Sequence, residues 1–173
     1  MSDRYLAYAV DRPAGRDDVA AAFNAIRLPK LGRIDEARLG RMLEGMVSKA
    51  FAEGLTIDVI DRSLVEVSGA TAGRVTYEVV VEGEQTRYLL YVLPGLEHGV
   101  ALTYSSGADD FARYQPVFEA SAAGTRGVRE PSALAQLFQT DEGHYLLGKM
   151  TGLLVGILLA GFLFVRVVRG MSR

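Results

Sequence analysis

The chain contains no cysteine and no tryptophan, and only two of its 173 residues are histidine. Without cysteine, disulfide bonds and thiolate metal sites are excluded, and the redox compartment stays open. His98 and His144 are the only side chains that ordinarily titrate near neutral pH, and neither belongs to an H-E-x-x-H or H-x-x-E-H pattern. We therefore expect no metal site and no cofactor.

Groupings of catalytic residues are also scarce. The residue types of a hydrolytic triad occur at Ser105, Ser106, Asp109 and His98, but the sequence contains no G-x-S-x-G motif. A helix cap accounts for Ser106 and Asp109 completely and is the favoured explanation. The glycine-rich segment 69–73 lacks the Lys-Ser/Thr of a phosphate-binding loop. We expect no catalytic residues, and hence a protein that is not an enzyme.

Positive charge is in deficit over most of the chain. The first 143 residues hold all 21 acidic residues against 15 Lys and Arg, a net charge of −6. An acidic domain is repelled by phosphate backbones, so we expect no nucleic-acid partner.

One long uncharged run lies near the C-terminus. The sixteen residues Met150–Val165 carry no charge, and Lys149 and Arg166 bracket them. The two cations are about 25 Å apart along a helix, and their long side chains can reach the headgroups of a core about 30 Å thick. A helix buried in a soluble core would show a polar face, which this run lacks. Residues 144–173 are therefore predicted to hold a single transmembrane helix and a basic tail in contact with membrane lipid. The predicted interface residues are Lys149, Arg166, Arg169 and Arg173.

The orientation of this anchor is predicted from two conflicting signals. Residues 1–18 have early acidic residues and no apolar run of signal-peptide length, which favours a tail-anchored protein with its N-terminal domain in the cytoplasm. The positive-inside rule favours the reverse, because three tail arginines outnumber Lys149. We expect a single-pass protein, of the bacterial inner membrane, with a cytoplasmic domain; the reverse orientation is the alternative.

The first 54 residues predict one strand and two helices. Residues 4–10 alternate weakly, as in a short edge strand. Residues 17–28 open with two aspartates and carry Val19, Phe23 and Ile26 at helical spacing. A second helix follows the capping residue Asp35 and ends near Gly54, with one apolar face made of Leu39, Met42, Leu43, Met46, Val47, Ala50 and Phe51. Core packing is the favoured role of that face, and a ligand groove is the alternative.

From residue 55 the apolar period changes to two. The pattern predicts four strands of an antiparallel meander, at 55–69, 74–83, 86–95 and 99–106. The third strand is apolar on both faces and is therefore expected at the centre. A further helix should start at Ser106–Asp109, be interrupted at Pro116, and face inward through Phe111, Tyr114, Val117 and Phe118. The predicted fold class is α+β: an antiparallel meander sheet packed on one face by helices, plus a single C-terminal transmembrane helix.

Three parts follow from this pattern: an α+β soluble domain at 1–123, a linker at 124–143, and the anchor at 144–173. The linker is broken by glycine and proline and contains a short amphipathic helix at 132–139. That helix either rests at the membrane interface or docks on the domain. A basic cluster lies between the first two helices: Arg27, Lys30, Arg33, Arg38 and Arg41. Interleaved acids favour a solvated surface there, and contact with anionic headgroups is the alternative.

Residues 65–128 resemble the PsbP/Mog1-like fold, including the bacterial proteins of unknown function built on it. The resemblance rests on a meander that ends in Leu102-Thr103-Tyr104, followed by a helix that carries Phe111, Tyr114, Pro116 and Phe118. Members of this fold are mostly non-enzymatic adaptors or accessory subunits. The resemblance therefore implies a non-catalytic interaction or accessory role, and the predicted anchor would make this module membrane-tethered. The rival hypothesis is a small-molecule or lipid-binding domain with an apolar pocket between sheet and helices.

Small residues recur every four positions along the predicted anchor, at Gly148, Gly152, Gly156 and Ala160. Helices in a bilayer associate where small residues let backbones approach closely, so this stripe predicts a homo-oligomer or pairing with another membrane protein. Gly161, which lies off the stripe, shows that glycine also occurs here without that spacing, so simple abundance of glycine in membrane helices is the alternative.

Replacement of Gly152 and Gly156 by isoleucine is expected to abolish crosslinked dimers of the isolated span in a bilayer, because the larger side chains hold the backbones apart. Crosslinking of the parent and the double variant at equal peptide-to-lipid ratio measures the effect. If the double variant forms as much crosslinked dimer as the parent, the stripe reflects only the abundance of glycine in membrane helices.

Overall fold

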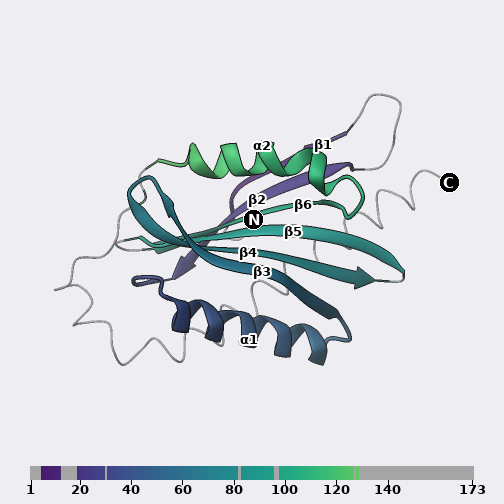
Figure 1. The fold of residues 1–173 in the computed structure, drawn as a ribbon, viewed down its shortest axis with the longest axis horizontal. Helices are drawn as coiled ribbons and strands as arrows, with labels where there is room; N and C mark the ends of the chain where they lie inside the picture. The colour runs from purple at the N-terminus through teal and green to yellow at the C-terminus, as the bar shows by residue number, and fades with distance from the viewer. Residues whose placement is uncertain are drawn as a thin grey trace.

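The computed structural model describes residues 5–12, 19–29, 31–81, 83–95, 98–126 and 128. These residues form six strands and two helices, which Figure 1 shows as a sheet between two helical layers. In chain order the elements are β1 (Tyr5–Asp11), β2 (Ala21–Pro29), α1 (Glu36–Ala52), β3 (Thr56–Val67), β4 (Ala70–Val81), β5 (Glu84–Leu93), β6 (His98–Gly107) and α2 (Phe111–Ala123).

The six strands form one antiparallel sheet in the order β1-β2-β6-β5-β4-β3. The predicted meander from β3 to β6 is confirmed, as are the edge position of β1 and the internal position of β5. A two-residue turn joins β3 to β4, with Ser68 and Gly69 both at positive φ (51° and 79°). That conformation matches the twist of a tight hairpin, so this register is fixed locally.

The predicted helix at 17–28 is wrong, because residues Ala21–Pro29 form strand β2. The spacing of its apolar residues is compatible with a helix and with a strand. In the strand that forms, Ala21 and Ala25 face the α2 side of the sheet, while Ile26 and Leu28 face the α1 side. β2 pairs with β1 on one side and with β6 on the other. Two rows of backbone hydrogen bonds and burial on both faces outweigh the helical preference of this alanine-rich segment.

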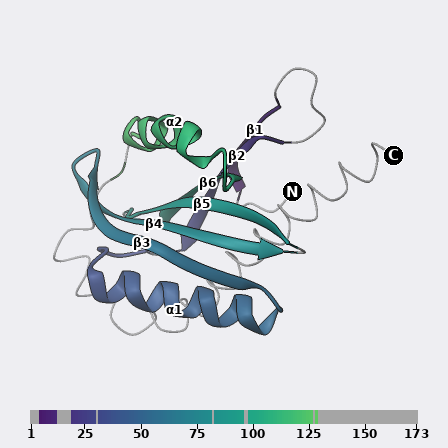
Figure 2. The same ribbon diagram turned by 45° about the vertical axis from the view of Figure 1, so that its right-hand side comes forward.

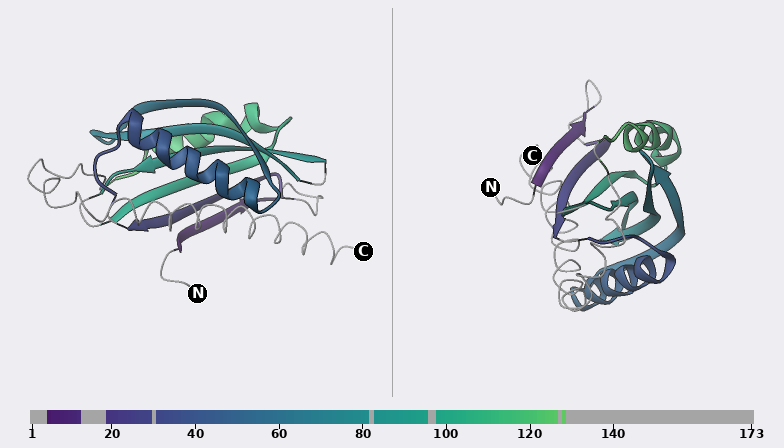
Figure 3. Two further views of the ribbon diagram at one scale, coloured as in Figure 1. Left: turned by 90° about the horizontal axis from the view of Figure 1, so that it is seen from below. Right: turned by 90° about the vertical axis from the view of Figure 1, so that its left-hand side faces the viewer.

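Helices cover both faces of the sheet, so the prediction of one covered face is wrong. Figures 2 and 3 show α1 on one face and α2 on the other. Two separate clusters of buried side chains correspond to these faces. β5 belongs to both, with Leu90 and Val92 under α1 and Leu89, Tyr91 and Leu93 under α2. A strand buried on both faces needs a covering layer on each.

Helix α1 closely follows its prediction. The Asp35 side chain accepts a hydrogen bond of 2.7 Å from the backbone N–H of Arg38 and so caps the helix. Its buried residues are Leu39, Met42, Leu43, Met46 and Ala50. Leu39 packs so closely on β4 that a Cβ at Gly73 would lie 2.7 Å from it. The predicted burial of Phe51 is wrong, since that side chain is 80% exposed.

Helix α2 departs further from its prediction. It begins at Phe111 after Asp110, which makes no side-chain cap, and the Ser106 hydroxyl donates to the carbonyl of Gly107 within the end of β6. The helix continues through Pro116. Phe111 and Phe118 face inward, as predicted, but Val117 is 63% exposed because it lies on the outer side of the helix.

Two stacked tyrosines, Tyr77 and Tyr88, lie in the α1-side core with ring centroids 5.0 Å apart. Burial raises the pKa of Tyr88 to about 12, and burial with the neighbouring Tyr88 raises the pKa of Tyr77 well above its ordinary value. Both side chains must therefore stay neutral in the folded protein.

Alkaline pH is expected to destabilise this core. The folded pKa of Tyr88 exceeds the unfolded value near 10, so its contribution is complete below pH 10 and is lost as pH rises towards 12, up to about 2–3 kcal/mol. Denaturant unfolding of the full chain in detergent, followed by circular dichroism across this range, measures the loss. Tyr88→Phe should flatten the decline, and an unchanged slope would contradict this assignment.

Candidate interaction site at the edge between α1 and β3

Strand β3 is an edge strand, and α1 packs beside it. Between the two elements is an open groove with a volume of about 660 Å³. Apolar side chains and charged or polar ones share its lining, namely Gly40, Leu43, Glu44, Val47, Ser48, Val59, Ile60, Asp61 and Arg62. The groove is thus bordered by the outer backbone edge of β3, which no strand of the described sheet pairs with.

A β-bulge at Ile60 shapes this edge. Val59 pairs with Tyr77 and Asp61 pairs with Thr76, so Ile60 is the extra residue in β3. Its side chain is 48% exposed. Bulges interrupt the regular ladder of an edge strand and thereby reduce unselective pairing with other chains. The bulge here also presents an apolar side chain at the rim of the groove.

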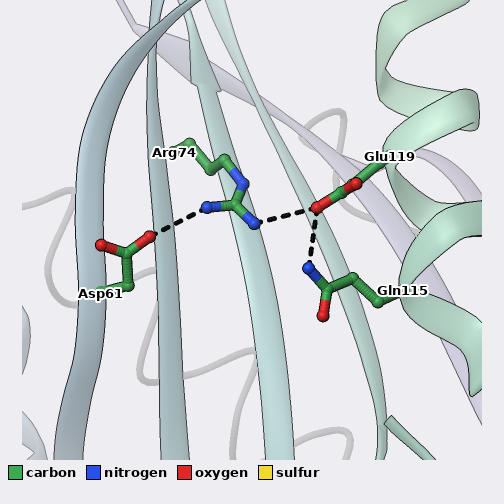
Figure 4. A network of polar contacts seen from close by, with 4 residues as sticks. All are labelled: Asp61, Arg74, Gln115 and Glu119. Atoms are coloured by element: carbon green, nitrogen blue, oxygen red, sulfur yellow. Dashed lines mark hydrogen bonds and ion pairs between the residues drawn. The ribbon is translucent and has the colours of Figure 1, made fainter. Parts of the chain in front are cut away.

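A polar network connects this edge to α2 (Figure 4). Arg74 on β4 donates from Nη1 to Asp61 Oδ2 on β3, and from Nη2 to Glu119 Oε1 on α2, each at 2.9 Å. Gln115 Nε2 donates to the same Glu119 oxygen at 2.8 Å. The side chain of Arg74 is 18% exposed, so its two ion pairs are partly shielded from water.

The network keeps its members charged. The hydrogen bond from Gln115, together with Arg74, holds the pKa of Glu119 below its usual value against the opposing effect of burial. Burial alone would lower the pKa of Arg74, but hydrogen bonds with Glu119 and Tyr91 outweigh it and raise that pKa. Neither group can exchange a proton readily near neutral pH. The arrangement therefore suits a clamp between β3, β4 and α2.

The structure does not assemble the residue types of a hydrolytic triad. His98 opens β6 and Ser106 lies near its other end, so eight strand rises of about 3.4 Å place them about 27 Å apart. His144 lies outside the described residues. Among the described residues, no group of three or more His, Asp or Glu could hold a metal ion.

The site residues predicted from the sequence lie outside the described part of the chain. They are the stripe Gly148, Gly152, Gly156 and Ala160 and the interface residues Lys149, Arg166, Arg169 and Arg173. Within the described ranges, the structure contains no helix that is long and apolar enough to cross a membrane.

Sequence reasoning missed both the groove and the Arg74 network. One signal was present, because consecutive apolar residues at Val59 and Ile60 break the alternation of β3 where the bulge occurs. For Arg74 there was none. Its carboxylate partners are 13 residues before it and 45 residues after it, and only the tertiary structure brings them together.

Comparison with known proteins identifies the fold alone. No protein-family model matches the sequence, and no curated protein matches it. Among solved structures, the chain is similar to PA94 from Pseudomonas aeruginosa, a protein of unknown function described as a putative regulator. The identity is 17% and the TM-score 0.56, over 76% of this chain and 88% of that one.

Two further structures match less well. Cyanobacterial PsbP (CyanoP) from Synechocystis sp. PCC 6803 is 12% identical with a TM-score of 0.49, over 70% of this chain and 82% of that one. LpqN from Mycobacterium tuberculosis, involved in cell envelope biogenesis, is 18% identical with a TM-score of 0.37, over 65% and 64%. These matches agree with the PsbP-like resemblance of the sequence at the level of the fold, and at these identities nothing on function passes to this chain.

Proposed function

We propose that this chain is a membrane-tethered, non-catalytic interaction module whose partner-binding surface is the groove between α1 and β3. The observation that carries the proposal is the position of this groove beside a free strand edge. An edge strand offers unpaired backbone N–H and C=O groups to an incoming extended segment, and adjacent pockets supply specificity for its side chains.

The chemistry of the lining suits a polypeptide partner. Val47, Val59 and Ile60 offer apolar contact, while Glu44 and Arg62 offer one charge of each sign. An apolar centre with a charged rim is the usual composition of a protein interface. The bulge at Ile60 limits regular pairing to short segments, which favours a selective partner over open-ended strand addition.

A small-molecule or lipid ligand is the second candidate, because a volume of about 660 Å³ lies in the range of ligand pockets. The location of that space weighs against it. The pocket expected from the sequence lay between the sheet and its helices, where α1 instead fills the space with Leu39, Met42 and Met46 against β4 and β5. The remaining groove is open along its length and therefore buries a small ligand poorly.

The membrane tether in this proposal is the segment Met150–Val165, which rests on its sequence alone. Its length and lack of charge suit a single span, with Lys149 and Arg166 at the two headgroup layers. Membrane lipid is then one partner. A second copy, or another membrane protein with a small-residue face, is the proposed partner within the bilayer.

The tether makes a direct prediction. The full chain should stay in the membrane pellet after carbonate washing, and Leu154→Arg with Leu158→Arg should release it, because each charge at the bilayer centre costs about 2.5–3.5 kcal/mol. Leu154→Ile with Leu158→Ile is the matched control and should remain in the pellet. Recovery of the unaltered chain in the supernatant would refute the tether.

The groove makes a second prediction. A photoreactive amino acid at Ile60 should form a discrete crosslink to another polypeptide in cells that express the chain, because this side chain stands at the rim of the proposed surface. The same group at Val117, which is exposed on the outer side of α2, is the matched control and should form none. Gel mobility and mass spectrometry of the adducts provide the readout.

Two results would count against the groove as a protein-binding surface. Equal crosslinking from positions 60 and 117 would mean that the groove is not selective. Native mass spectrometry of the purified chain gives the other test, since a lipid or small molecule bound at one copy per chain, and lost on Val47→Asp, would favour the ligand-binding alternative.

A further inference from the structure

The described chain finishes at one particular end of the sheet. After α2 the carbonyl of Thr125 accepts a hydrogen bond from the Ser68 hydroxyl in the turn between β3 and β4. Val128 packs against the buried cluster on the α2 side. These two contacts fasten the exit of the domain beside the β3–β4 turn, at the left-hand end in Figure 1. The last described residue, Val128, therefore lies at this end, and the predicted anchor follows it in the sequence.

Cationic side chains gather at the same end. β2 ends here, and α1 and β6 begin here, as the register of β2 with β6 and the ribbon in Figure 1 show. Four of the five arginines of this group are exposed and Arg38 is half-buried: Arg27, Arg33, Arg38, Arg41 and Arg126. Among the described residues, three acids share this end, Asp35, Glu36 and Glu66, and Asp35 is occupied in capping α1.

The opposite end of the domain is acidic. It carries the ends of β1, α1 and β6, the starts of β3 and β5 and the connection from β6 to α2. The acidic residues there are Asp11, Glu53, Asp58, Glu84, Asp109 and Asp110. Two of its cations are neutralised locally, since Lys49 pairs with Glu53 at 3.8 Å and Arg87 pairs with Glu78. No ion pair between described residues involves the five arginines of the exit end, and the same holds for Arg12 and Arg113 at the opposite end.

Two arginines of the exit end, Arg38 and Arg41, are close enough for the charge of one to affect the other. Burial lowers the pKa of Arg38 and the nearby charge of Arg41 lowers it further, while Asp35 opposes both. An anion placed over this end would relieve that repulsion.

We infer that the arginine-bearing end of the domain faces the membrane and contacts anionic lipid headgroups through Arg27, Arg33, Arg38, Arg41 and Arg126. This inference rests on the proposed tether. Residues 129–149 span at most about 70 Å when extended, so the connection alone permits many orientations of the domain. Charge then selects among these orientations, because each arginine near an anionic surface raises the equilibrium constant for contact about fivefold. The groove between α1 and β3 is lined from the middle of both elements, by residues 40–48 of α1 and 59–62 of β3, so most of it lies away from the arginine-bearing end.

The absence of cysteine allows a direct test with single fluorescent labels on the full chain. Ala123→Cys and Ala112→Cys place a label at either end of α2, about 16 Å apart along its axis, and both alanines are exposed. Each labelled chain is reconstituted into vesicles of phosphatidylcholine, with or without phosphatidylglycerol, that contain a headgroup-attached quencher. We expect stronger quenching at position 123 than at position 112 with phosphatidylglycerol, and loss of the difference without it or near 1 M salt, where the Debye length is about 3 Å.

Charge variants complete the test. Arg33→Gln, Arg41→Gln and Arg126→Gln together should remove the difference between the labels. The matched control is Arg12→Gln, Lys49→Gln and Arg113→Gln, which neutralises three cations away from the exit end and should leave the difference intact. Circular dichroism checks that both triple variants are folded.

The possible failures are distinguishable. If the chain does not float with the vesicles after carbonate washing, the tether fails and this inference fails with it. If the chain floats but the two labels are quenched equally with phosphatidylglycerol, or position 112 is quenched more, the tether stands and the orientation is wrong. Quenching at position 123 that persists without phosphatidylglycerol would mean that the tether, not the arginines, holds this end at the surface.

Discussion

Burial of the central strands on both faces is the constraint on which the rest of this structure depends. β5 places Leu90 and Val92 on one face and Leu89 and Leu93 on the other, and all four side chains are almost fully removed from water. Neither face can be left to solvent without exposing a row of large apolar groups. The chain meets this requirement with one helix on each side, and the close approach of Leu39 to Gly73 shows how tightly the α1 layer is packed.

Covering both faces leaves the strand edges as the places where the fold can offer main-chain groups to a partner. β3 is such an edge, and its bulge at Ile60 turns an apolar side chain outwards next to the groove beside α1. Arg74 holds the opposite face of the same edge to α2 through Asp61 and Glu119. The surface that we propose for a partner is thus supported by both helical layers, which gives it the rigidity that selective recognition needs.

The same connectivity also separates charge along the domain. An antiparallel sheet brings the end of one strand beside the start of the next, so residues far apart in sequence collect at two opposite ends. Arg33 and Arg126 reach the same end through the start of α1 and the exit of α2, which is fastened there by Ser68 and Thr125. A net charge of −6 over the first 143 residues hides this polarity. Among the described residues, Asp11, Glu53, Asp58, Glu84, Asp109 and Asp110 lie towards the other end. Net charge describes solubility and long-range attraction, whereas orientation at a surface depends on where the charges lie.

The sequence by itself determined the elements whose signals are local. The capped amphipathic helix α1, the four strands of the meander and the internal position of β5 all follow from capping, periodicity and turn residues within short windows. The uncharged run at Met150–Val165 is equally readable, although it lies outside the described residues. Only the tertiary structure decided the state of residues 21–29, because their alanines and their apolar residues at two periods suit a helix or a strand until β1 and β6 supply hydrogen bonds on both sides. It also decided that the two helices lie on opposite faces and that Arg74 meets Asp61 and Glu119. These outcomes depend on contacts between segments tens of residues apart, and no local pattern of residue types encodes such contacts.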